Sequence, residues 1–316
     1  TSELTTRVTE GTTTVYVTVE VSSSILLLPE TPMMGRFDNQ KVGYFTNPLL
    51  NFSDAQQGTD KTQYITRWRM EPKPEDREAY LKGQIVEPAK PIVFYIDNST
   101  PYQWRSYIKK GIEDWQVAFE KAGFKNALRV KMADSKTVLE EQRAVIAYDL
   151  HEAGIRTGYT FHPKTGEILS CRVNIGHGFL PKELWRYVLE CGTVDDRIRK
   201  EFFHPDVVGE ILRSKVIRAV GSVLGLKENL AGSAAYTAEQ VKSVAWLKQH
   251  GYTGSIMDNN PYNYAVQKSD KVAARELMPR IGDYDCLAIE WGIGSFPRAK
   301  TPIRIARFCG KSFGNV

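Results

Sequence analysis

Residues 218–229 hold the most informative set of polar side chains in this 316-residue chain, with the sequence Arg-Ala-Val-Gly-Ser-Val-Leu-Gly-Leu-Lys-Glu-Asn. Residues four apart share one face of a helix, so Arg218 and Ser222 are expected to lie one turn apart. Gly225 is typical of the turn that ends a helix, and Glu228 follows it by three residues. These positions supply a guanidinium, a hydroxyl and a carboxylate, which are groups for ion pairing and hydrogen bonding.

A methionine segment follows at residues 254–258, with the sequence Gly-Ser-Ile-Met-Asp. Together with residues 218–229 it resembles the metzincin zinc metallopeptidases, whose zinc motif is His-Glu-x-x-His-x-x-Gly-x-x-His. Gly225 is in register with the glycine of that motif. The similarity to a metzincin-like family of large secreted bacterial proteins extends to residues 92–124, 165–169, 207–213 and 284–292. The resemblance assigns a Met-turn, the methionine-bearing turn beneath the metal, to Ser255, Ile256, Met257 and Asp258.

The resemblance implies four zinc-site positions, and all four residues depart from the family pattern. Arg218 and Ser222 occupy the first and second ligand positions, Ala219 the general-base position and Glu228 the third ligand position. Such sites hold zinc with three neutral imidazoles and use a carboxylate to take a proton from the bound water. A guanidinium stays protonated above about pH 12 and puts a positive charge where the metal would bind. We expect no zinc, no other cofactor and no catalytic residue; Asn259, where the family often has Tyr, removes a further transition-state donor.

The turn at Gly225 predicts what takes the place of the metal. In the resembling motif the residue three positions after the glycine returns to face the helix, so Glu228 should lie near Arg218 and Ser222. A buried or half-buried guanidinium needs an anionic partner. We therefore expect an ion pair between Arg218 and Glu228, and we expect Glu228→Gln to lower the melting temperature more than Arg218→Met combined with Glu228→Gln.

Other reactive groups carry weaker signals. The histidines lack metal-ligand spacing, and each is expected to be exposed or to make a single hydrogen bond: His151, His162, His177, His204 and His250. Asp283, Asp285 and Glu290 are candidates for an acid/base pair, but their Trp-bearing segment predicts packing. The Gly-Lys-Ser at residues 310–312 lacks the earlier glycine of a phosphate loop, and no Gly-x-Ser-x-Gly nucleophile motif occurs.

The helix that carries Arg218 is predicted over residues 205–224. Pro205 and an acidic residue stand in its first turn, as is typical of a helix start. Its core side is formed by Leu212, Val216, Val220 and Val223. The opposite side holds small and polar residues, and it is expected to carry Arg218 and Ser222 into a cleft.

The remaining pattern predicts an α/β (α+β) fold. One long helix is expected over residues 102–124, because apolar residues recur there at steps of three and four. The expected strands are residues 92–96, 128–132, 144–148, and a hairpin of 158–161 and 168–175 around the turn at 163–166. This is a mixed twisted sheet with two long helices, which is the fold that the resemblance implies for the catalytic domain.

The N-terminal part is predicted to be β-rich. Residues 12–28 alternate β-branched and polar residues and favour a strand pair around a Ser-Ser-Ser turn at 22–24. Residues 26–64 resemble the segment before the catalytic domain in the same family. We expect residues 1–90 to belong to a larger N-terminal domain and residues 91–316 to form a degenerate catalytic domain.

Composition excludes several classes of protein. Apolar residues make up 42% and charged residues 25%, the proportions of an ordinary globular chain. The net charge is +5 with both signs interleaved, so no nucleic-acid partner is expected. No apolar run approaches the roughly 18–20 residues of a transmembrane helix. The chain begins at Thr1 without a leader, as a mature or truncated protein would. The cysteines are too widely spaced for a zinc ribbon, and their pairing stays open: Cys171, Cys191, Cys286 and Cys309.

These observations predict a catalytically inactive metzincin-like metallopeptidase homologue, a pseudoenzyme. The resemblance implies a bacterial protein that is secreted or in the cell envelope, either periplasmic or associated with the outer membrane. Its cleft is expected to bind an extended peptide or protein by strand addition, or the domain serves as a scaffold. The alternative is an active hydrolase that uses Glu228 with Asp258 or a serine. The oligomeric state stays open.

Overall fold

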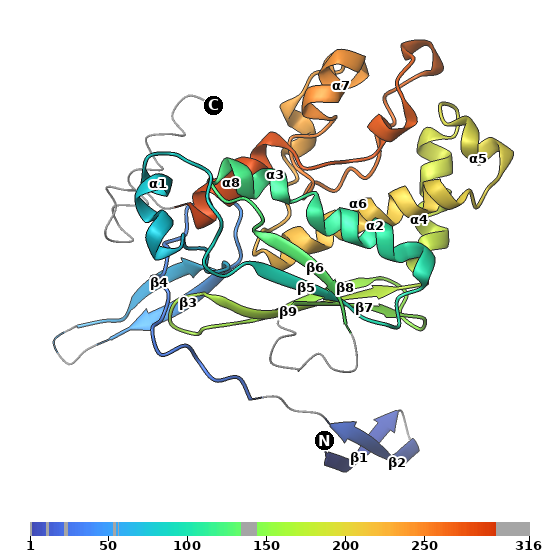
Figure 1. Cartoon of the computed structure of the whole chain (residues 1–316). Coiled ribbons are helices and arrows are strands. Elements are labelled where there is room, and N and C mark those ends of the chain that lie inside the picture. The colour runs from blue at the N-terminus through green and yellow to red at the C-terminus, as the bar shows by residue number, and fades with distance from the viewer. Residues whose placement is uncertain are drawn as a thin grey trace. The chain divides into compact units, whose positions relative to one another are not determined.

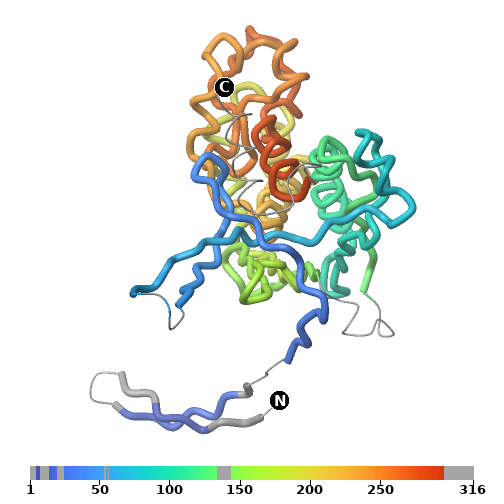
Figure 2. The backbone as a smooth tube through the Cα atoms, turned by 90° about the vertical axis from the view of Figure 1, so that its left-hand side faces the viewer, coloured from blue at the N-terminus to red at the C-terminus, as the bar shows by residue number. Residues whose placement is uncertain are grey.

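The computed structural model describes residues 2–10, 13–21, 25–52, 55, 57–133 and 144–294. The chain forms two compact units, Thr1–Pro32 and Met33–Val316, drawn in Figures 1 and 2. Residues 33–90 lie within the second unit. The domain boundary expected near residue 90 stays a prediction.

The first unit contains an antiparallel hairpin of β1 (Ser2–Glu10) and β2 (Thr13–Val21). The strand pair expected within residues 12–28 is therefore wrong in its second member, because residues 25–28 form no strand. The nine residues of β1 offer β2 a partner of equal length, with far more cross-strand contacts than a four-residue apolar run. The turn expected at residues 22–24 lies outside the described residues.

The second unit is built on a five-stranded sheet in the order β6-β5-β7-β9-β8. β5 (Ile92–Ile96), β6 (Leu128–Met132), β7 (Ala144–Asp149) and β9 (Ile168–Gly176) are parallel. β8 (Ile155–Phe161) pairs antiparallel with β9 and forms one edge. This mixed sheet with helices confirms the predicted α/β class.

The helices of the second unit gather over one face of the sheet (Figure 1). The single helix expected over residues 102–124 is wrong, because the chain forms α2 (Tyr102–Glu113) and α3 (Gln116–Lys121). The Trp115 N–H bonds to the Ile112 carbonyl at 3.3 Å, three residues back, instead of four. This tighter turn lets two successive side chains face the same neighbouring helix.

That neighbouring helix is α6 (Pro205–Val223), which confirms the helix predicted over residues 205–224. The Asp114 carboxylate accepts two hydrogen bonds from Arg213, and the Trp115 indole N–H donates to the Ile217 carbonyl at 2.8 Å. The predicted core side is also confirmed, since these residues are fully buried: Leu212, Val216, Val220 and Val223.

The chain before the sheet wraps onto α6 and the C-terminal helix. β3 (Thr46–Asn51) and β4 (Asp60–Ile65) form an antiparallel pair. Just before β3, Tyr44 donates its hydroxyl to the Ala288 carbonyl at 2.9 Å. Ala288 belongs to α8 (Asp283–Ile293), which packs beside α3 in both views (Figures 1 and 2).

The other helices are shorter, apart from α4. They are α1 (Arg77–Leu81), α4 (Phe179–Cys191), α5 (Asp196–Lys200) and α7 (Val244–His250). Single 3₁₀ turns cover Pro74–Asp76, Gly232–Ala235, Gln240–Lys242, Lys268–Asp270 and Ala274–Leu277. None of the helices in the described part of the chain combines the length and apolar character needed to cross a bilayer. Three of the four cysteines lie in that part as buried free thiols: Cys171, Cys191 and Cys286.

Candidate functional site

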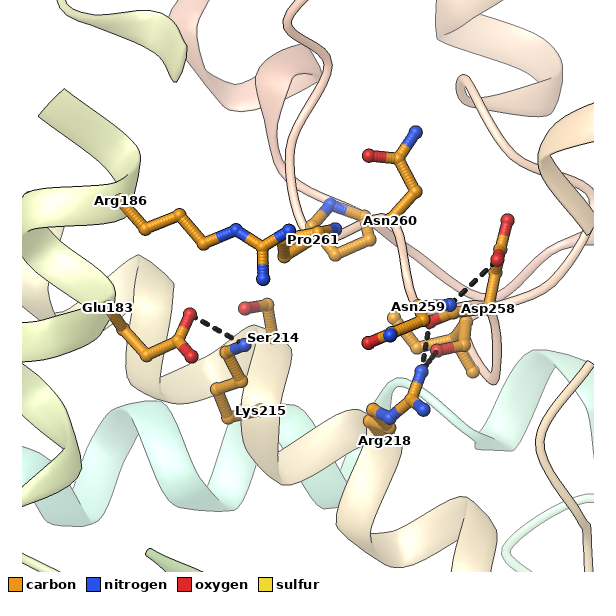
Figure 3. Close-up of a pocket in the computed structure, with 11 residues that line it drawn as sticks. Glu183, Arg186, Ser214, Lys215, Arg218, Asp258, Asn259, Asn260 and Pro261 are labelled. Carbon is orange, nitrogen blue, oxygen red and sulfur yellow. Dashed lines mark hydrogen bonds and ion pairs between the residues drawn. The ribbon is translucent and has the colours of Figure 1, made fainter. Parts of the chain in front are cut away.

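Arg218 occupies the centre of the candidate site, near the C-terminal end of α6. Its Nη2 lies 2.7 Å from Oε1 of Glu228, which confirms the predicted ion pair. Its Nη1 donates to the backbone carbonyl of Asp258, and the Ile256 carbonyl is 3.5 Å away (Figure 3). The guanidinium therefore joins α6 both to the loop after the helix and to the predicted Met-turn. Within the described residues, the Ser222 hydroxyl has no hydrogen bond to either charged group.

Arg218 is half-buried, as expected, but its carboxylate partner is mostly exposed. The Arg218 side chain is 24% exposed and the Glu228 side chain 67% exposed. Water therefore solvates the carboxylate, and the pair resembles a surface ion pair on that side.

Glycine at position 225 brings Glu228 back toward the helix. Its φ of +102° lies in the left-handed region, and a Cβ there would collide with the Thr66 carbonyl oxygen. The Gly225 carbonyl accepts a hydrogen bond from Phe45 N–H at 2.8 Å, and Lys227 N–H donates to the Gly43 carbonyl at 2.8 Å. The segment before β3 thus fixes the turn that the sequence predicts.

The methionine segment lies against α6, as the resemblance implies for a Met-turn. Met257 is 1% exposed, and its sulfur would be 2.5 Å from a Cβ built on Gly221. A glycine at position 221 thus allows the thioether to approach the helix backbone. The methionine segment therefore covers part of the small, polar face of α6, which was expected to line a cleft.

Asp285 holds this methionine segment in place. Its carboxylate is fully buried, lies 2.6 Å from the Ser255 hydroxyl, and accepts the backbone N–H groups of Ile256 and Gly282, each at 2.7 Å. Burial raises the pKa of Asp285 from its ordinary value of 3.8 to about 6. Residues 283–290 were expected to pack, and Asp285 does so by accepting three hydrogen bonds. No local spacing in the sequence indicated these bonds.

The four positions that the resemblance assigns to zinc do not form a ligand set for it. They hold a guanidinium, a methyl group, a hydroxyl and one carboxylate that is already paired with the guanidinium. Zinc in proteins takes Cys, His and carboxylate ligands, four in a closed site. Within the described residues, no group of three His, Cys, Asp or Glu side chains is placed to hold a metal ion. We derive no chemical step through zinc, and the absence of bound zinc stays a prediction.

A polar hollow of about 100 Å³ adjoins Arg218. Its walls come from α4, from α6 and from the loop after the methionine segment, and Figure 3 shows its lining side chains. On α6, Lys215 Nζ lies 2.7 Å from Oε2 of Glu183, which belongs to α4. Burial lowers the pKa of Lys215 more than Glu183 raises it. Sequence reasoning did not identify this hollow, because its cations come from two helices separated by thirteen residues of intervening chain, 192–204.

Three histidines each make one side-chain hydrogen bond, in line with expectation, whereas the buried Nδ1 of His204 has no partner among the described residues. Nδ1 of His177 is 2.7 Å from the Tyr148 hydroxyl, and Nδ1 of His250 is 2.9 Å from Oδ2 of Asp283. His162 accepts the Lys164 N–H at 3.1 Å. None of these contacts forms part of the Arg218 site.

The edge strand β8 is the second element of interest. It contacts α6, and Tyr159 on this strand shares a hydrogen bond of 2.9 Å with the Thr66 hydroxyl. In the described part of the chain, β8 pairs with β9 alone, so its outer backbone edge has no strand partner there. Such an edge can accept an added strand.

Two regions of the chain match protein-family models. Residues 200–310 match a family model described as "Met-zincin", and residues 1–73 match one described as "Domain of unknown function (DUF5117)". Neither the comparison with curated proteins nor the comparison with solved structures gives a match. The first match contains Arg218, the turn at Gly225 and the methionine segment, which are the features that carry the sequence resemblance. Residues 200–310 are therefore similar to a metzincin-like, metallopeptidase-like family, in line with the resemblance seen in the sequence.

Proposed function

We propose that this protein is a metzincin-like pseudoenzyme that binds an extended peptide or protein segment in its cleft and does not hydrolyse it by zinc chemistry. The observation that carries the proposal is the position of Arg218. Its guanidinium, which the resemblance assigns to the first ligand position, contacts Glu228 and the Asp258 carbonyl.

A fixed guanidinium at that position opposes metal binding. Two unit charges 4 Å apart near a protein surface interact by about 4 kcal/mol, and a dication doubles that figure. Zinc would have to displace the arginine from three backbone and side-chain oxygens and would then find no imidazole.

Peptide binding is supported by the outer edge of β8, which has no strand partner among the described residues. An extended peptide can add to such an edge through main-chain hydrogen bonds, which need neither a metal nor a nucleophile. The strand contacts α6, the helix that carries Arg218. If no peptide binds, we conclude that the domain serves as a structural scaffold.

The alternative hydrolase finds no specific support in the contacts. Glu228 is ion-paired, and Asp258 accepts bonds from the Asn259 N–H at 2.7 Å and the Thr253 hydroxyl at 3.1 Å. Ser255 is fully buried against Asp285. We therefore do not assign a nucleophile or a general base.

The test restores the family motif in its own positions. The variant carries Arg218→His, Ala219→Glu, Ser222→His and Glu228→His, and the matched control carries Arg218→His and Ser222→His alone. Metal content after dialysis against zinc and casein hydrolysis are measured for the native protein and both variants. We expect negligible zinc and no hydrolysis for the native protein, and about one zinc per chain for the four-residue variant. A native protein that retains about one zinc, or that hydrolyses casein in a chelator-sensitive way, refutes the proposal.

We also propose location in the bacterial cell envelope or outside the cell. The support is the family resemblance alone. Fractionation of the source cells tests it, because recovery in the cytoplasmic fraction is incompatible with the proposal.

A further inference from the structure

We propose that the hollow beside Arg218 binds a carboxylate group of the peptide in the cleft, with Arg186 as its main contact. This inference rests on the proposed peptide-binding function and adds the class of ligand. The hollow joins α4, α6 and the loop at residues 258–261. Its lining combines three cationic side chains with two amides: Arg186, Lys215, Arg218, Asn259 and Asn260.

Arg186 has hydrogen-bond donors to spare. Its Nε donates to Oε1 of Glu190 at 2.8 Å, one turn along α4. No described residue accepts from its two terminal amino groups, and Figure 3 shows the guanidinium extending over the hollow. A guanidinium binds a carboxylate with two parallel N–H···O bonds, which is the strongest geometry available to it.

Asn259 supplies a second free donor on the opposite side. Its side-chain amide has no hydrogen-bond partner among the described residues, and in Figure 3 it points back toward the hollow. Lys215 stands between these two groups and contributes positive charge, although its Nζ already contacts Glu183. The three residues approach from three different segments, so a ligand atom in the hollow can meet donors on several sides.

The two carboxylates that line the hollow are already bound. Glu183 accepts from Lys215 at 2.7 Å and from the Tyr262 hydroxyl at 3.2 Å. Asp258 accepts from its neighbouring backbone N–H and from a threonine hydroxyl. The charged atoms that line the hollow without a partner among the described residues include the two terminal amino groups of Arg186, which favour an anionic ligand.

The size of the hollow limits the ligand. About 100 Å³ accommodates several water molecules or one short side chain that ends in a carboxylate. An aromatic side chain would not enter without movement of the walls. Two sources fit this chemistry, an acidic side chain and the free C-terminus of the peptide.

The experiment titrates the full-length chain with three matched peptides and follows binding by heteronuclear NMR. The first is an acetylated pentapeptide amide with aspartate between four alanines, and the second has asparagine instead. The third is acetylated penta-alanine with a free C-terminal carboxylate. Shifts of the β8 amides report peptide binding itself, and shifts of the Arg186 Nε–H and the Asn259 side-chain amide report occupation of the hollow.

We expect at least one carboxylate peptide to bind about tenfold more tightly than the asparagine peptide, in line with a charged hydrogen bond. The aspartate and free-acid peptides then identify the source of the carboxylate. Arg186→Gln should abolish the difference, whereas Lys182→Gln, an exposed change on α4 outside the hollow, should preserve it. Thermal unfolding of both variants checks that the fold is intact.

Three other results overturn the inference in different ways. Equal affinity of all three peptides, with shifts along β8, refutes the carboxylate site and leaves peptide binding in place. No shift at β8 or at the hollow with any peptide refutes both proposals and leaves the scaffold. An unchanged preference for the carboxylate in Arg186→Gln would also refute the assignment of Arg186.

Discussion

The contacts of Arg218 predict a specific order of stabilities for three variants. Glu228→Gln removes the charged partner, Arg218→Met removes the guanidinium, and the combination removes both. Sequence reasoning alone predicts that the single change at Glu228 is worse than the double change, because it leaves a charge unpaired. The structure favours the reverse order, since Arg218 keeps its carbonyl partners and access to water when Glu228 is neutralised.

The magnitudes follow from exposure. With Glu228 67% exposed, the ion pair is expected to contribute about 0.2–1 kcal/mol. The carbonyls of Ile256 and Asp258 belong to residues that are only 3% and 7% exposed. Removing their donor with Arg218→Met is expected to cost about 1–3 kcal/mol. The double variant should therefore be close to Arg218→Met and less stable than Glu228→Gln.

Urea unfolding of the native protein and the three variants gives a double-mutant cycle. Glu120→Gln serves as the control, because that carboxylate is exposed and has no ion pair among the described residues. We expect a coupling energy below about 1 kcal/mol that shrinks further in 0.5 M salt. A melting temperature that falls by roughly 2–4 °C per kcal/mol provides a second readout. The reasoning is refuted if Glu228→Gln is less stable than the double variant, or if the coupling exceeds about 2 kcal/mol.

Two further predictions concern the methionine segment. Because burial raises the pKa of Asp285 to about 6, the favourable contribution of this carboxyl group to stability is present below its ordinary pKa of 3.8 and is lost as pH rises through about 6. In urea unfolding, the stability difference between the native protein and Asp285→Asn should therefore fall by up to roughly 3 kcal/mol between pH 4 and pH 7. A difference that does not depend on pH would contradict this prediction. Gly221→Ala places a Cβ 2.5 Å from the Met257 sulfur and 2.7 Å from the Trp115 ring, so we expect a loss of about 1–3 kcal/mol despite the better helix propensity of alanine. Gly158→Ala, which meets no atom within 4 Å, is the control for that measurement, and equal midpoints for the two alanine variants would argue against close packing at position 221.

The local sequence pattern was sufficient to predict the elements that carry the site. The 3.6-residue period of α6 placed its buried side correctly, and Pro205 and Gly225 marked its ends. The strands expected at residues 158–161 and 168–175 around the turn at 163–166 likewise predicted the hairpin of β8 and β9. These features depend on neighbours within one or two turns of chain, so the sequence contains the information directly.

Two elements were mispredicted because distant contacts decided them. The helix break at Trp115 exists because both it and the preceding Asp114 bond to α6, some hundred residues later. The partner of β2 is β1, although the apolar residues 25–28 have the stronger strand pattern. Pairing and packing energies of this kind override local propensity.

At the site, sequence by itself determined the chemical groups, the turn at Gly225 and the meeting of Arg218 with Glu228. Tertiary structure alone decided how exposed that pair is, that Arg218 also holds the methionine segment, and that Asp285 clamps the same segment from α8. It alone also brought Arg186 to the hollow beside Arg218. The physical reason is that burial and charge partners depend on which segments fold over a residue, and those segments lie far away along the chain.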